Sequence, residues 1–246
     1  MAQDKPVALI TGANKGIGLE TARQLGQEGI IVIVAARDFS KSERATEILR
    51  GEGIDARSLK LDVTDAQDRD AAVKFIEQNF GKLDILVNNA GIMVEGEWFA
   101  NNSGTISSKT LQQTFDTNFF GPVALTQQLL QLLRKAPAAR IVNLSSIMGS
   151  LGLHSDPKSP IFNMKPFGYD ASKTALNAFT VHLAHALRDT NIKVNSAHPG
   201  WVKTDMGTDA APMDVVEGAK TTVELATLPE DGATGTYVHL GKPLPW

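Results

Sequence analysis

The chain has 246 residues, a formal net charge of −3 at pH 7 and 42% hydrophobic residues, which suits one soluble α/β domain with a large core. It contains no cysteine, which excludes disulfides and cysteine-ligated zinc, and no basic run, which argues against nucleic acid as a partner. No apolar stretch reaches the about 18 residues that span a membrane, and the N-terminus lacks the layout of a signal peptide, so we expect a cytoplasmic protein.

Short apolar runs typical of buried strands alternate with longer helical patterns along the chain. The predicted strands are residues 7–11, 30–36, 56–61, 83–87, 140–144, 193–197 and 236–240. The predicted helices are residues 17–28, 41–50, 66–79, 110–133, 169–188 and 214–226. This alternation predicts a single Rossmann-type domain over residues 1–246, with about seven strands in a doubly wound parallel sheet and helices on both faces.

Two stretches interrupt the alternation, residues 95–108 and the proline-bearing residues 154–166. Both follow the carboxyl ends of strands, where ligands bind in an open α/β sheet. We therefore predict substrate loops near residues 93–108, 147–168 and 201–215. For individual polar residues in these loops, such as Asn102, a solvated surface is the simpler interpretation.

Residues 11–18, TGANKGIG, follow the first strand and open the first helix. Gly12 permits a tight turn, Gly16 lets the backbone approach a pyrophosphate, and Gly18 lets the helix pack near the sheet. The helix N-terminus offers free N–H groups to phosphates. The run lacks the Gly-Lys-Ser/Thr end of a mononucleotide P-loop, so we interpret it as a dinucleotide-binding turn.

The residues after the second strand indicate which dinucleotide binds. An acidic residue there favours NAD, whereas an arginine accommodates the 2′-phosphate of NADP. Arg37 comes first and can bind a phosphate bidentately, and Lys15 adds a second positive charge nearby. Asp38 is a counter-signal, because it could face the ribose or pair with Arg37. We predict NADP(H) as the cofactor.

Tyr169 and Lys173 lie four residues apart at the start of a predicted helix. A helix brings positions i and i+4 to one face, so the ammonium can lie beneath the phenol. A cation there favours the phenolate and is expected to lower a tyrosine pKa that is about 10 when unperturbed. Tyr169 is therefore a candidate proton donor near neutral pH.

Taken in order, these motifs resemble the short-chain dehydrogenase/reductases along almost the whole chain. The matching runs are Thr11-Gly12-x-x-x-Gly16-x-Gly18, Leu61-Asp62-Val63, Asn88-Asn89-Ala90-Gly91, Asn118, Ser145-Ser146, Tyr169-x-x-x-Lys173 and Pro199-Gly200. Within that family the chain looks most like the carbonyl reductases, through residues 14–18, 36–38, 118–121 and 199–206.

The resemblance implies a role for each matching position. Asp62 and Val63 would contact the adenine, Val202 and Thr204 the nicotinamide carboxamide, and Asn118 a water that links Lys173 to solvent. The implied catalytic residues are Asn118, Ser146, Tyr169 and Lys173, with Ser145 as the alternative serine. The implied cofactor-binding residues are Gly12, Asn14, Lys15, Gly16, Ile17, Gly18, Arg37, Asp62, Val63, Asn89, Ala90, Gly91, Tyr169, Lys173, Pro199, Gly200, Val202 and Thr204.

The chain departs from many family members in one spacing, because Ser146 and Tyr169 are 23 residues apart. Residues 154–166 supply the extra length. The resemblance implies that an insertion here favours monomers, so a homo-oligomer and a monomer both remain open.

The implied function is NADPH-dependent reduction of a ketone or aldehyde to an alcohol, with Tyr169 as proton donor assisted by Lys173 and Ser146. Methionines and aromatic residues suggest an apolar small-molecule carbonyl substrate, and the candidates are Met93, Ile147, Met148, Phe162, Met164, Trp201 and Met206. No histidine set with metal-ligand spacing is present, so no metal is expected. The alternatives are a catalytically silent NADP sensor or scaffold and a cofactor-free lyase, against which the intact glycines, Tyr169 and Lys173 argue.

Overall fold

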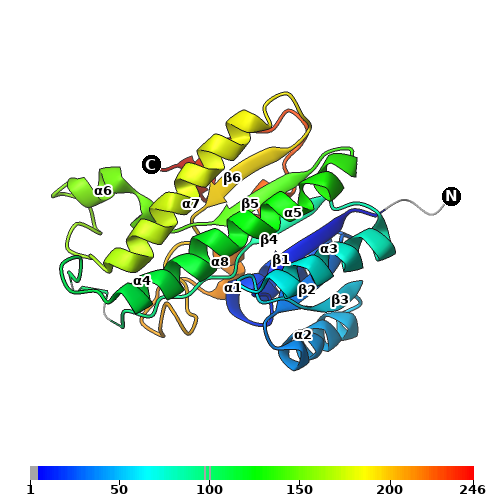
Figure 1. The fold of residues 1–246 in the computed structure, drawn as a ribbon, viewed down its shortest axis with the longest axis horizontal. Coiled ribbons are helices and arrows are strands. Elements are labelled where there is room, and N and C mark those ends of the chain that lie inside the picture. Colours follow the sequence, from blue (N-terminus) through cyan, green and yellow to red (C-terminus); the bar gives the residue numbers. More distant parts are fainter. Residues whose placement is uncertain (1–4, 97, 100) are drawn as a thin grey trace.

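A computed structural model of the chain describes residues 5–96, 98–99 and 101–246. Its sheet runs in the order β3-β2-β1-β4-β5-β6-β7-β8, and the strands from β3 to β6 are labelled in Figure 1. The strands are β1 (Val7–Thr11), β2 (Ile31–Ala36), β3 (Ala56–Lys60), β4 (Ile85–Asn88), β5 (Arg140–Leu144), β6 (Lys193–Ala197), β7 (Tyr237–His239) and β8 (Lys242–Pro243). Neighbouring strands pair in parallel, except that β8 pairs antiparallel with β7.

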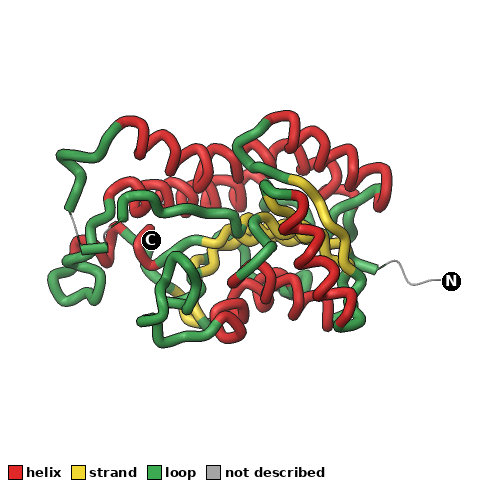
Figure 2. Tube along the Cα trace, turned by 90° about the horizontal axis from the view of Figure 1, so that it is seen from below, coloured by secondary structure: helices red, strands yellow, loops and turns green. Residues whose placement is uncertain are grey.

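Helices cover both faces of the sheet (Figure 2). They are α1 (Gly16–Gln27), α2 (Phe39–Gly51), α3 (Ala66–Phe80), α4 (Ser108–Phe115), α5 (Gly121–Lys135), α6 (Leu151–Ser155), α7 (Phe167–Ala186) and α8 (Val215–Ala226). One apolar core joins the sheet to α3, α5 and α7, and a second core joins it to α1, α2 and α8. The predicted doubly wound α/β fold is therefore confirmed.

The buried strands contribute to both cores because successive side chains point to opposite faces. In β1, Leu9 packs into the first core and Ala8 and Ile10 into the second. In β2, Ile33 packs into the first core and Val34 into the second. A strand covered on both faces needs apolar residues at every position, which explains the continuous apolar runs in the sequence.

Three elements differ from the sequence predictions. The long helix predicted over residues 110–133 is divided into α4 and α5 by a π-helical turn over Asp116–Phe120, whereas its entry through Ser107 and Ser108 is as expected. The short helix α6 and the two-residue strand β8 were not predicted, because each is too brief to have a recognisable period.

The strand order reverses between β1 and β4, which opens a crevice at their carboxyl ends. The glycine turn follows β1 at this end of the sheet, residues 89–91 follow β4, and Ser145 and Ser146 follow β5. None of the helices in the described residues has the length and apolar character needed to cross a membrane.

Candidate active site

A cleft of about 1840 Å³ extends along the carboxyl ends of the strands. Its volume exceeds that of an ordinary small-molecule pocket, about 300–1,000 Å³, and gives room for a dinucleotide beside a substrate. The tertiary structure brings all the catalytic and cofactor-binding residues expected from the sequence to the walls of this cleft except Asn118.

Ser146, Tyr169 and Lys173 come together at one end of the cleft. The Ser146 side chain hydrogen-bonds Tyr169, and the Lys173 Nζ lies 5.6 Å from the centre of the phenol ring. The same Nζ donates to the Leu144 carbonyl oxygen at 2.8 Å, which ties the lysine to the end of β5. This geometry favours Ser146 over Ser145 as the serine that acts with the tyrosine.

Burial governs the ionisation of this group. It raises the pKa of Tyr169 to about 12, although the hydrogen bond with Ser146 acts in the opposite direction. It lowers the pKa of Lys173 to about 8. The expectation that the lysine would lower the tyrosine pKa was wrong in direction for this structure, because desolvation disfavours both charged forms. The phenol is therefore protonated at neutral pH.

Asn118 lies buried in the π-helical turn and faces the chain after β4. Its Oδ1 accepts from the Ile92 N–H at 2.8 Å, and its Nδ2 donates to the Ile92 carbonyl at 2.8 Å and to the Ser172 Oγ at 3.0 Å. Single π turns inside helices occur frequently at functional sites. Here the turn lets one amide join the loop after β4 to the helix that carries Tyr169 and Lys173.

The glycine turn has the shape of a phosphate cradle. Gly12 has φ +63°, and a Cβ there would lie 3.0 Å from the Ala90 Cα. A Cβ at Gly18 would lie 2.4 Å from the Asn89 Nδ2, so only glycine fits. Lys15 precedes α1 without a side-chain cap, which leaves the first N–H groups of the helix open to an anion. These residues fit the pyrophosphate of a dinucleotide.

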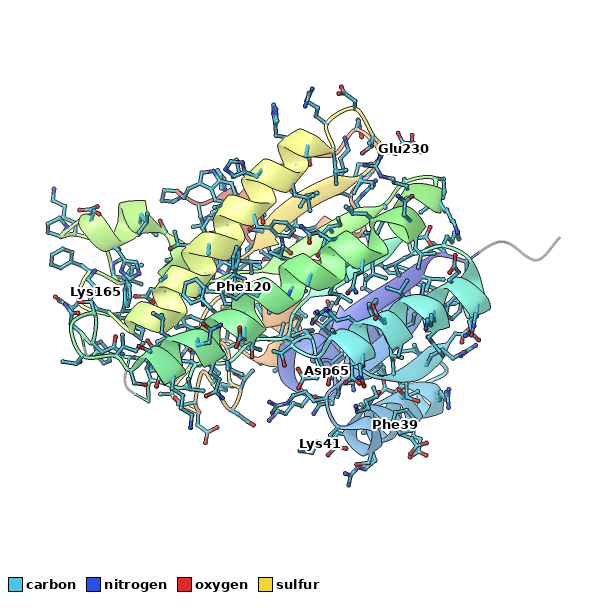
Figure 3. The ribbon with its side chains drawn as sticks, viewed as in Figure 1. Phe39, Lys41, Asp65, Phe120, Lys165 and Glu230 are labelled. Carbon is cyan, nitrogen blue, oxygen red and sulfur yellow. The ribbon has the colours of Figure 1, made fainter. Side chains whose placement is uncertain are left out.

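Two basic residues line the cleft after β2, Arg37 and Lys41. Lys41 lies in the first turn of α2 (Figure 3), and the sequence analysis did not single it out. The Asp38 carboxylate caps α2 by accepting from the Ser40 N–H at 3.0 Å and from the Ser40 hydroxyl at 2.8 Å, and Asp38 also lines the cleft. An acidic residue at this position therefore has a structural role that does not depend on a ribose or on Arg37.

The segment after Gly200 closes over the glycine turn. Gly200 has φ +93°, and a Cβ there would lie 2.2 Å from the Met213 sulfur. The methyl group of Thr204 approaches Gly16, where a Cβ would lie 3.4 Å away. Lys15 forms an ion pair with Asp205 of the same segment, which links the two sides of the cleft.

Apolar side chains form the wall around Tyr169. Met93, Ile147, Met148, Met164, Trp201 and Met206 line the cleft as expected. Phe162 does not line the cleft, and the Lys165 ammonium lies 5.1 Å from the centre of its ring. Trp98, which no sequence motif indicated, meets the Tyr169 ring edge-on with 5.6 Å between centroids.

Two polar residues of the loop after β4 hold the start of α7. The Glu95 Oε1 accepts from the Gly168 N–H at 2.6 Å, and the Asn102 Oδ1 accepts from the Phe167 N–H at 3.0 Å. Both therefore satisfy free donors of the helix that carries Tyr169. Asn102 thus has a structural role that its loop context did not indicate, because Phe167 lies 65 residues away in the sequence.

Beside the cleft, His154 contacts Asp170 with 3.2 Å between Nε2 and Oδ2. Burial lowers the pKa of His154, while burial and the nearby Glu95 raise the pKa of Asp170 to about 8. Both groups are therefore neutral at pH 7, and their contact is not an ion pair. The Lys165 ammonium, labelled in Figure 3, donates to the His154 carbonyl at 2.9 Å.

The doubly wound sheet, the glycine turn and the long cleft define a Rossmann-type nucleotide-binding protein. The short chain dehydrogenase family model matches residues 6–214. Carbonyl reductase (NADPH) 1 of Mus musculus is 33% identical, and the match covers 100% of both chains. The (−)-isopiperitenone reductase of Mentha piperita is 34% identical over 99% of each chain.

Among solved structures, carbonyl reductase Sniffer of D. melanogaster superimposes with a TM-score of 0.84 at 30% identity. The match covers 98% of this chain and 100% of that one. The chain therefore belongs to the short-chain dehydrogenase/reductase family of nicotinamide-dependent oxidoreductases, and within that family it resembles the carbonyl reductases.

Proposed function

We propose that the protein reduces a ketone or aldehyde to an alcohol with NADPH as hydride donor. The observation that carries this proposal is the meeting of Tyr169, Ser146 and Lys173 within one cleft that also reaches the glycine turn. The names of the carbonyl reductase relatives support the same activity and the same cofactor.

The bound nicotinamide supplies the hydride, and the chain supplies orientation and electrostatics. Gly12 to Gly18 would hold the pyrophosphate, Asp62 and Val63 the adenine, Asn89 to Gly91 the adenosine ribose, and Val202 and Thr204 the carboxamide. Arg37, with Lys15 and Lys41, would bind the 2′-phosphate and so favour NADPH over NADH.

The Ser146 and Tyr169 hydroxyls would both donate hydrogen bonds to the carbonyl oxygen of the substrate. Ser146 would stabilise the negative charge that develops on this oxygen, and Tyr169 would transfer its proton to it. The raised pKa of Tyr169 keeps that proton on the phenol at neutral pH, as a proton donor requires. The Lys173 ammonium would stabilise the phenolate that remains. Asn118 would hold a water that links Lys173 to solvent, through which the Tyr169 phenolate regains its proton.

The Met-rich wall supports an apolar substrate, because methionine and aromatic side chains contact apolar groups of varied shape without demanding a charged anchor. We expect larger hydrophobic ketones and aldehydes to be reduced faster than small carboxylate-bearing ones. A cytoplasmic location is a prediction from the sequence alone.

The experiment is to follow the loss of NADPH absorbance, with NADH in parallel, against aromatic ketones, aliphatic ketones, aldehydes, diketones and quinones. NADPH-dependent turnover supports the reductase. NADPH binding without turnover of any member of the panel would instead favour a catalytically silent NADP sensor. The absence of NADPH binding would refute the proposal.

A further inference from the structure

The peptide bond that follows Ser146 is held at both of its polar atoms by side chains from the last quarter of the chain. The Tyr237 hydroxyl donates to the Ser146 carbonyl oxygen at 2.5 Å. The Ile147 N–H donates to the His198 Nδ1 at 3.1 Å. Because that carbonyl and that N–H belong to one planar unit, the two bonds together fix its orientation.

The orientation of this peptide determines where the Ser146 side chain points. Ser146 has extended backbone angles, φ −155° and ψ 150°, at the junction between β5 and a short 3-10 turn over Ile147–Gly149. Its Oγ accepts from the Met148 N–H at 3.3 Å, so the hydroxyl follows the backbone of the turn. A rotation of the peptide would therefore move the hydroxyl relative to Tyr169.

The two side chains that hold the peptide come from neighbouring strands of the sheet. Tyr237 lies on β7 opposite Ser196 of β6, and His198 directly follows β6. The Tyr237 ring is buried and stacks on Trp246 with 5.5 Å between centroids. The side chains of Ser145 and Asn177 also lie near the Tyr237 hydroxyl.

His198 is suited to accept this bond at all ordinary pH values. It is buried, and burial together with the neighbouring His239 lowers its pKa to about 3. The His239 Nδ1 lies 2.9 Å from the His198 carbonyl, and the rings of the two histidines are 4.8 Å apart. The imidazole is therefore neutral near pH 7, and its Nδ1 lone pair stays available to the Ile147 N–H.

We infer that Tyr237 and His198 are positioning residues, which act on the proposed reaction by holding the Ser146–Ile147 peptide so that the serine hydroxyl faces Tyr169. The inference rests on the proposed reductase function. Of the two side chains, His198 lines the cleft and Tyr237 does not. The role assigned to each acts through Ser146, so its effect should disappear when the serine hydroxyl is removed, whereas the effect of a residue that merely stabilises the fold should persist.

The decisive experiment is a double-mutant cycle on the full chain. Tyr237→Phe removes one hydroxyl and keeps the ring that stacks on Trp246. We expect kcat to fall about tenfold, since a misplacement of about 1 Å can cost up to 10²-fold, while the Kd for NADPH stays within about twofold. In a Ser146→Ala background, the same substitution should cause no further loss, because the group it positions is gone.

Two His198 variants test the other bond. His198→Leu removes the acceptor and should lower kcat to a similar degree, whereas His198→Gln offers a side-chain oxygen to the Ile147 N–H and should restore part of the rate. Ser42→Ala is the matched control, because the buried Ser42 hydroxyl also donates to a backbone carbonyl, that of Val34, at 2.5 Å. This control should lower the melting temperature and keep the wild-type kcat.

Hydrogen exchange at the Ile147 amide gives a readout that does not depend on turnover. Both Tyr237→Phe and His198→Leu should accelerate this exchange, with no change at the amides of β2. A wild-type kcat in Tyr237→Phe, an equal fractional loss in the Ser146→Ala background or unchanged Ile147 exchange would each overturn the inference. An inactive wild-type enzyme would instead count against the proposed function, and the exchange result would still decide whether the peptide is held.

Discussion

The proposed reaction predicts a loss of activity between pH 7 and pH 10 that an exposed lysine would not cause. Lys173 is buried, and desolvation lowers its pKa from 10.5 to about 8. Tyr169 keeps its proton throughout this interval, because its pKa is about 12. The charged ammonium is therefore the group whose loss limits the reaction as the pH rises.

The size of the effect follows from the pKa. A lysine with a pKa of about 8 is roughly 90% charged at pH 7, roughly 10% at pH 9 and roughly 1% at pH 10. We expect kcat/KM to be constant below pH 7 and then to fall about tenfold for each pH unit above 8. With an unshifted pKa of 10.5, the fall would begin more than two units higher.

The assay measures initial rates of NADPH oxidation at limiting NADPH and a fixed carbonyl substrate, because kcat/KM reports the ionisation of the free enzyme. Circular dichroism at each pH separates loss of activity from unfolding. A Lys173→Arg variant keeps its charge over the whole range, so its residual rate should not fall near pH 8. A wild-type profile that stays flat to pH 9.5 would refute either the lowered pKa or the need for the charge.

Three further predictions concern single residues. Tyr169→Phe should retain NADPH binding, measured by fluorescence titration, and lose turnover by at least about 10³-fold; near-wild-type turnover would exclude Tyr169 as the proton donor. Arg37→Asp should weaken NADPH about 10–100-fold and leave NADH nearly unchanged; equal losses would remove Arg37 from the phosphate site. Asp170, with a pKa raised to about 8 by burial and Glu95, adds stability that is complete below pH 3.8 and lost as pH rises through 8. The melting temperature of Asp170→Asn, relative to wild type, should therefore rise between pH 4 and pH 8; a constant difference would contradict the raised pKa.

Much of the fold could be predicted from local sequence patterns. Strands buried on both faces need apolar residues at every position, so β1 and β2 stand out as continuous apolar runs. The glycine turn is also recognisable in the sequence, because its backbone requires glycine at fixed positions. A Cβ at Gly18, for example, would collide with the Asn89 side chain. The elements that were missed, α6 and β8, are short and acquire their structure from packing rather than from their own periodicity.

The clustering of the proposed catalytic residues was also foreseeable, in part from helical geometry. Tyr169 and Lys173 are four residues apart, so a helix places them on one face. Ser146 follows the end of β5, and ligands bind at the carboxyl ends of the strands in this kind of sheet. The local sequence did not reveal that Asp38 caps α2, because an aspartate after a strand is equally compatible with a ribose ligand, a partner of Arg37 or a helix cap.

The sequence by itself determined the order of strands and helices, the glycine turn and the identities of the chemically active side chains, since these depend on spacing over a few residues. Only the tertiary structure decided that burial raises the Tyr169 pKa, that Glu95 and Asn102 hold the start of α7, and that Tyr237 reaches the Ser146 carbonyl. Desolvation and these contacts, between residues 65 to 91 positions apart, arise only when the sheet has assembled, so no local pattern contains them.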